Sequence, residues 1–307
     1  MQRNLLKLPV LLFLSLFFAI PTQAQTIQLD LTGLEDLGPN FVYEGWLIGG
    51  GPPSSAGTFT VDSAGIPSQN LFNVGAALDN ASSFLITIEP FSDPDPGPSS
   101  TNFLAGDLMG GVADLTVGHG LAFGDDFLSA TGSFILGVPT TDPADSVPYT
   151  QGIWWLDPAG PSTSLNLPTL PAGWEYEGWV VGPGGPVSTG RFTDPESFDS
   201  DGGGPAAGPN PGPPFPGQNF VNPATNLIGY EAFISIEPVP DNSSAPFTLR
   251  PLVDSNIEDV GEGVLQTTTN NAASFPTARV SAVPEPSGLL IAFLGLTSVG
   301  LGRRRRQ

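Results

Sequence analysis

Short runs in which apolar and polar residues alternate recur along the middle of the chain, separated by turns rich in glycine and proline. Residues 27–31 (Ile-Gln-Leu-Asp-Leu) alternate as a half-buried strand does. Further strands are predicted at 41–48, 57–61, 84–88, 103–106, 113–117, 131–136 and 152–156. Between Gln25 and Val283 no convincing apolar period of 3.6 occurs, apart from a turn or two of helix at 70–80. The pattern predicts an all-β, sandwich-like protein.

One unit occurs twice. Tyr43-Glu44-Gly45-Trp46 returns in the second half of the chain as Tyr176-Glu177-Gly178-Trp179. Ile86-Thr87-Ile88-Glu89-Pro90 returns as Ile234-Ser235-Ile236-Glu237-Pro238, and the two landmarks are farther apart in the second copy. We therefore expect two tandem β modules, at 25–160 and 161–255, with an insertion in the second one.

Two segments of the second half have a composition that does not favour a core. The inserted loop, residues 199–217, is rich in glycine and proline and is predicted to be exposed and mobile. Residues 256–282 are largely polar and are predicted to be a spacer that leads to the C-terminal segment.

The N-terminal segment, residues 1–24, has the features of a secretory signal peptide. Arg3 and Lys7 precede an apolar run at 8–20, and Thr22 and Ala24 provide the small residues of a cleavage site. The alternative is an N-terminal membrane anchor, for which the apolar run is short. Export is therefore the expected fate of the modules that follow.

The C-terminal segment, residues 283–307, combines three features in a fixed order. Pro284-Glu285-Pro286 comes first, an apolar stretch at 287–302 follows, and Arg303, Arg304, Arg305 and Arg306 come last. The apolar stretch is predicted to form a transmembrane helix, with the arginines as a membrane stop on the cytoplasmic side.

This order resembles the PEP-CTERM sorting signal of Gram-negative bacteria. The resemblance implies an exosortase, an integral-membrane cysteine protease, as processing partner, with cleavage near the motif and release or transfer to the cell surface. It also implies an association with exopolysaccharide and biofilm. An ordinary single-pass anchor in the inner membrane is the alternative.

The charge distribution excludes one class of partner. The chain carries a net charge of −21, and between the two ends only Arg191, Arg250 and Arg279 oppose about 29 acids. A surface this acidic repels phosphate backbones, so nucleic-acid binding is excluded. Cysteine is absent, which removes disulfides and thiolate metal sites.

Candidate chemistry is sparse, and we expect no enzyme activity. Glu44 and Glu177, like Glu89 and Glu237, occupy equivalent repeat positions, which favours a structural role over a glycosidase acid pair. His119 lacks a nucleophile elbow. The adjacent tryptophans at 154–155 could stack on sugar rings, or simply pack inside.

No cofactor is expected, except for a candidate Ca²⁺ site. Asp194, Glu196, Asp199 and Asp201 lie close together in sequence and offer hard oxygen ligands. No twelve-residue loop with a closing glutamate follows, so solvated carboxylates are the alternative.

The repeat signature resembles the extracytoplasmic domain of anti-sigma-K factors. An aromatic strand, a Gly-Pro-Val-Ser turn (185–188) and a strand ending in Glu-Pro carry the resemblance, which would cover both modules. It implies a shared sensor-side fold. Sigma-factor regulation is not implied, because that activity needs a cytoplasmic domain joined through a central membrane helix.

These observations predict an exported, non-enzymatic surface or extracellular-matrix protein, adhesive or associated with exopolysaccharide. The alternatives are a secreted carbohydrate-active enzyme with paired carboxylates and an envelope sensor module.

Overall fold

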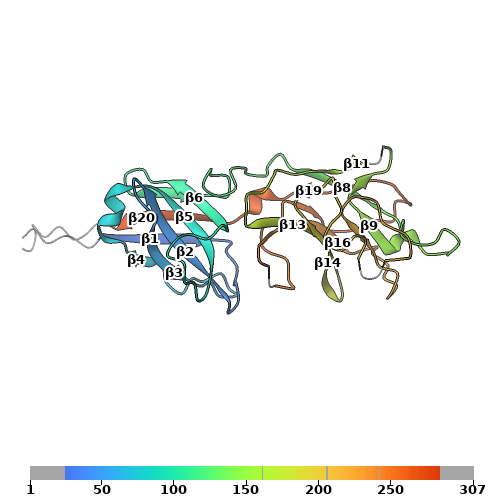
Figure 1. The fold of residues 1–307 in the computed structure, drawn as a ribbon, viewed down its shortest axis with the longest axis horizontal. Helices are drawn as coiled ribbons and strands as arrows, with labels where there is room; N and C mark the ends of the chain where they lie inside the picture. Colours follow the sequence, from blue (N-terminus) through green and yellow to red (C-terminus); the bar gives the residue numbers. More distant parts are fainter. Residues whose placement is uncertain (1–24, 161, 205–206, 242, 284–307) are drawn as a thin grey trace, which may run out of the picture.

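The computed structural model describes residues 25–160, 162–204, 207–241 and 243–283, and these form two lobes along the long axis of the molecule (Figure 1). The predicted signal peptide (1–24) and, after Val283, the predicted sorting segment with its transmembrane helix lie outside the described residues. Almost all regular structure is β, so the predicted fold class is confirmed in its coarse form. In the described part of the chain, no helix is long and apolar enough to cross a membrane.

The first lobe consists of two four-stranded sheets. One has the order β4-β1-β20-β7 and the other β3-β2-β5-β6. Their bounds are β1 (Thr26–Thr32), β2 (Phe41–Gly49), β3 (Ser54–Phe59), β4 (Leu71–Asn73), β5 (Ala81–Pro90), β6 (Asn102–Asp107), β7 (Val112–Leu115) and β20 (Thr277–Val283). A short 3₁₀ segment, η1 (Gly75–Asn80), falls in the region where a helical turn was predicted.

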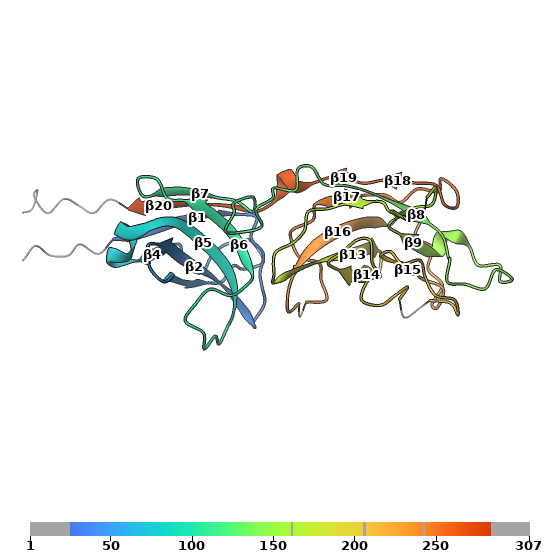
Figure 2. The same cartoon turned by 45° about the horizontal axis from the view of Figure 1, so that its top comes forward.

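The last described strand returns to the first one. β20 pairs antiparallel with β1 along its whole length, from Thr26 opposite Val283 to Thr32 opposite Thr277, and its other edge pairs with β7. Figure 2 shows that β20 and β1 lie side by side in one sheet, although they are far apart in the sequence. The prediction of a polar spacer at 256–282 is therefore wrong for residues 277–282, which form most of a core strand. Alternating Ala278 and Val280 are buried, and this two-residue period is what makes the segment a strand.

The second lobe is built around two five-stranded sheets. The orders are β14-β13-β16-β17-β19 and β12-β8-β9-β15, with β18 added to β8, and β10 and β11 form a separate pair. The bounds are β8 (Thr131–Leu136), β9 (Gly152–Trp154), β10 (Leu156–Asp157), β11 (Ser162–Thr163), β12 (Leu165–Asn166), β13 (Trp174–Gly182), β14 (Gly185–Phe192), β15 (Gly217–Asn219), β16 (Glu231–Pro238), β17 (Leu252–Asp254), β18 (Gln266–Thr267) and β19 (Thr269–Asn270), with 3₁₀ segments η2 (Tyr149–Gln151) and η3 (Ala272–Ser274).

The pairing of strands divides the chain differently from the predicted boundary at residue 160. β8 and β9 precede that boundary, yet they belong to the second lobe, where β9 pairs with β15. The second lobe is therefore inserted between β7 and β20 of the first. Strand alternation alone does not say which distant strand will be the partner, and this is why the boundary was misplaced.

The two copies of the repeat have equivalent pairing. β2 lies between β3 and β5, as β13 lies between β14 and β16. In each copy the ladder of the central strand with the next one is irregular near the signature glycine. Gly57 and Gly190, at equivalent positions in β3 and β14, have φ values of +130° and +106°, which favour glycine. The repeated pattern Ser-x-Gly-x-Phe, at 55–59 and 188–192, thus encodes a kinked hairpin.

Aromatic side chains join the lobes into one core. Trp174 of the second lobe lies with its ring centroid 5.9 Å from that of Phe103 in the first. Phe247 contacts both rings, at 5.6 Å and 5.9 Å. The indole N–H of Trp174 donates to the carbonyl of Asn102 at 3.1 Å. The lobes therefore pack directly on each other.

The inserted loop at 199–217 packs partly on a tryptophan, so it is less exposed than predicted. Phe215 is buried with Trp154, and the Asp199 carboxylate accepts backbone N–H groups from Gly202 (2.8 Å) and Gly217 (2.9 Å). These contacts bury both ends of the loop, whereas residues 209–211 in its middle are exposed.

Candidate functional site

A buried hydrogen-bonded network links the signature tryptophan to Glu89, the penultimate residue of β5, in the first lobe. The Trp46 indole N–H donates to Thr87 Oγ1 at 2.9 Å, and the Thr87 hydroxyl donates to Glu89. Glu89 also accepts the backbone N–H of Ser99 at 2.8 Å. Glu89 is only 1% exposed, and its Oε2 atom has no partner.

The second lobe contains the same network at equivalent positions. Trp179 Nε1 donates to Ser235 Oγ at 2.8 Å, and the Ser235 hydroxyl donates to Glu237. Glu237 accepts the backbone N–H of Phe247 at 2.9 Å. The threonine of one copy is replaced by serine in the other, and both keep the hydroxyl that the tryptophan requires.

The signature glutamates on the central strands point to neighbouring serines. The Ser55 hydroxyl donates to Glu44 and the Ser188 hydroxyl donates to Glu177. Glu44 is half-buried, whereas Glu177 is only 5% exposed. Because Ser188 reaches one oxygen of Glu177, the other, Oε2, remains buried without a partner.

Three carboxylates come together in the second lobe. Glu177 lies on β13, Glu237 near the end of β16, and Asp241 in the loop that follows β16. One carboxylate oxygen from each lies within 4.8 Å of the others, and this is the only such group of three or more acids, histidines or cysteines in the described ranges. We call this group the acidic triad.

Burial and mutual repulsion perturb two of the three acids. Burial raises the pKa of Glu237 to about 8, against the hydrogen bonds from Ser235 and Phe247, and the neighbouring Glu177 and Asp241 raise it further. Burial likewise raises the pKa of Glu177 to about 7, with the Asp241 charge acting in the same direction. Negative charge at the triad is therefore costly unless a cation or a proton offsets it.

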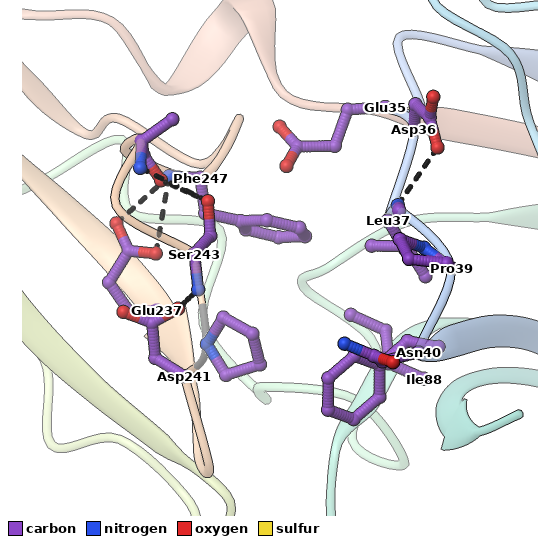
Figure 3. A pocket seen from close by; sticks show the side chains of 14 residues that line it. Glu35, Asp36, Leu37, Pro39, Asn40, Ile88, Glu237, Asp241, Ser243 and Phe247 are labelled. Carbon is purple, nitrogen blue, oxygen red and sulfur yellow. Dashed lines mark hydrogen bonds between the residues drawn. The ribbon is translucent and has the colours of Figure 1, made fainter.

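The triad lies next to a pocket between the lobes. This pocket, of about 240 Å³, is lined by Glu35, Asp36 and Asn40 of the first lobe and by Glu237 and Asp241 of the second. Figure 3 shows the first-lobe residues on one wall facing the second-lobe residues on the other. Asp241 also lines a second opening, of about 550 Å³, together with Glu177 and Trp179.

Glu35 gives the interlobe pocket a pH dependence. Burial raises its pKa from 4.5 to about 7, although the Arg250 charge lowers it. A carboxyl group whose pKa is higher in the folded state binds more protons when folded, so stability falls as the pH rises from 4.5 to 7. We expect this one group to remove about 3 kcal/mol of unfolding free energy over that window.

Urea unfolding of the wild type and of Glu35→Gln at pH 4.5 and pH 8 measures this contribution. The glutamine variant should lose less stability than the wild type between the two pH values. Equal losses would show that Glu35 titrates normally. Asp30→Asn is the matched control, since Asp30 is an exposed acid of the first lobe that does not line this pocket.

The structure does not bring the four predicted Ca²⁺ ligands into one group. Asp199 is buried and accepts loop N–H groups, and Asp194 accepts the backbone N–H of Glu196 at 2.9 Å. Asp201 lies against Asp199. These acids organise their own loop, and among the described residues the acids that do gather are those of the triad.

Asp241 is not among the site residues predicted from the sequence, although the repeat contains a signal for it. The pattern Glu-Pro-x-x-Asp occurs at 89–93 and again at 237–241, so Asp93 is equivalent to Asp241. In the first lobe Asp93 is exposed, and Glu44, Glu89 and Asp93 do not form a triad.

The adjacent tryptophans and the histidine singled out in the sequence are not part of the acidic triad. Trp154 and Trp155 are 1% and 0% exposed, so neither offers a surface for sugar stacking. His119 lies in the first lobe with its Nε2 atom 3.3 Å from Asp107 Oδ1.

Comparison with known proteins gives one family match. The family described as "Anti-sigma-K factor rskA, C-terminal" matches residues 15–101, which include β1 to β5 of the first lobe. The match supports the resemblance seen in the repeat signature, over the first copy. No curated protein and no solved structure matches the chain significantly.

Proposed function

We propose that this protein is a non-enzymatic component of the bacterial cell exterior. In this proposal it is exported, processed by an exosortase, and carries two β-sandwich-like copies of a module similar to the anti-sigma-K factor ectodomain. Its role is adhesive or exopolysaccharide-associated. The supporting observation is the duplicated network, in which the repeated glutamates accept hydrogen bonds from the module's own side chains.

The burial of these acids argues against the glycosidase alternative. A glycosidase needs two carboxyl groups that face an open cleft able to hold a sugar ring. Glu237 and Glu89 are each 1% exposed, and Glu177 is 5% exposed. Such groups favour a structural role or a small bound ion over contact with a polysaccharide.

The position of β20 fits removal of the tail. The strand ends at Val283, immediately before the Pro284-Glu285-Pro286 motif. Cleavage near the motif would therefore leave every strand of the first lobe complete. This favours an exported protein that stays folded after it is separated from its sorting segment.

Expression in a Gram-negative host with and without its exosortase tests the proposal. Intact mass spectrometry should show loss of the segment after the motif only when the protease is present. Replacing Glu285 by alanine should block that loss. A tail that remains in both hosts would contradict sorting by this route.

The family match favours an envelope sensor as second candidate. A sensor needs a retained anchor and a signalling partner, so it predicts an intact tail and a membrane-bound protein. Fractionation of the same two strains distinguishes the candidates, because the surface protein leaves the membrane fraction and the sensor does not.

A further inference from the structure

We propose that the acidic triad, Glu177, Glu237 and Asp241, binds one Ca²⁺ ion. The site is separate from the four residues that the sequence suggested, and it does not depend on the proposed cell-surface role. Three observations carry it: the spacing of the oxygens, a buried oxygen without a partner, and the kinds of side chain present.

The spacing suits a single cation. Ca²⁺ binds carboxylate oxygens at about 2.3–2.6 Å, so two oxygens on one ion are at most about 5 Å apart. The three triad oxygens all lie within 4.8 Å of one another. One ion placed among them therefore lies within reach of all three carboxylates.

The unpartnered oxygen points to a missing partner. Glu177 is only 5% exposed, and its Oε2 atom makes no hydrogen bond although Ser188 satisfies Oε1. A buried carboxylate oxygen without a donor is costly, and a cation among the three acids would remove that cost.

The donor set selects the ion. The triad offers carboxylate oxygens only, and Ser188, Ser243 and Ser244 line the adjoining opening with further hydroxyl groups. Oxygen ligands of this kind suit Ca²⁺, whereas zinc requires nitrogen or sulfur ligands in most proteins. Asp241 is half-buried beside two openings, which gives an ion access from solvent.

The first lobe provides a natural control. Glu44, Glu89 and Asp93 occupy the equivalent positions, but they are not gathered within 4.8 Å, and Asp93 is exposed. Glu89 Oε2 is also buried without a partner, so it is the gathering of three acids that assigns the ion to the second lobe alone.

The test uses the full-length protein, purified in detergent and stripped with EGTA, at pH 8. Addition of 10 mM CaCl₂ should raise the melting temperature by at least about 2 °C if the affinity is in the range of about 10⁻⁴ to 10⁻³ M. Tb³⁺ should give luminescence on tryptophan excitation, because Trp179 lines the same opening.

Asp241→Asn should lose the CaCl₂ response and weaken Tb³⁺ binding at least tenfold. This half-buried loop residue can be changed with little risk to folding. The matched variant Asp93→Asn should respond like the wild type. Either of two results would overturn the site: an equal rise with MgCl₂ or NaCl of the same ionic strength, or a wild-type response in Asp241→Asn.

Discussion

A chain that ends at Pro276 should not fold its first lobe. Without β20, β1 loses every pair that it makes with that strand, and β7 loses its pairs as well. Val280, which is fully buried, also leaves the core. Because a domain is stable by only about 5–15 kcal/mol, loss of a central strand exceeds what the lobe can tolerate.

Two truncated proteins, one of residues 25–276 and one of residues 25–283, isolate the effect of β20 on stability. The longer chain should melt cooperatively, and the shorter one should lose the first-lobe transition and be cut by protease within residues 25–115. Val280→Asp, which places a charge at the same buried position, should reproduce the loss in the full chain. Equal melting curves for the two chains would contradict the central role of β20.

Tyr43→Ala should lower the unfolding free energy of the first lobe by about 3–5 kcal/mol, the range for removal of a large buried aromatic side chain. Tyr43 is 0% exposed and stacks on Phe59 with centroids 5.4 Å apart. Its hydroxyl donates to the carbonyl of Glu35 at 3.0 Å. Tyr43→Phe keeps the ring and should cost about 1 kcal/mol.

The second copy of the repeat provides a matched variant for Tyr43→Ala at the equivalent tyrosine. Tyr176 is also 0% exposed, stacks on Phe192 at 5.6 Å and donates to the carbonyl of Pro168, which is equivalent to Glu35. Tyr176→Ala should therefore cost a similar amount in the second lobe. Urea unfolding followed by tryptophan fluorescence measures both. A cost below about 1 kcal/mol in either copy would show that the repeated tyrosine is not a core anchor.

Local pattern was enough to predict the elements that carry the repeat. The alternation at 84–88 and the aromatic-glycine signature predicted β5 and β2, and their second copies followed from the repeat. The glycine-proline run at 49–53 separates the strands predicted at 41–48 and 57–61, and β2 and β3 do pair as neighbours. The positive φ of Gly57 and Gly190 was not predicted.

Long-range pairing could not be predicted in the same way. Residues 277–283 do alternate, but their only apolar residues are alanine and valine, and their partner, β1, lies near the opposite end of the chain. The triad has a similar origin. Asp241 follows a strand that was predicted, but only the folded loop brings its carboxylate to Glu177, which lies on a different strand of the sheet.

The pairing of β1 with β20 has a mechanical consequence. Thr26 lies opposite Val283, so the two ends of the described chain leave the first lobe at the same place. A pulling force applied between these ends would open the β1–β20 ladder one residue pair at a time, as a zipper opens. The second lobe, attached at the far side through both of its connections, would carry no load until that ladder had separated.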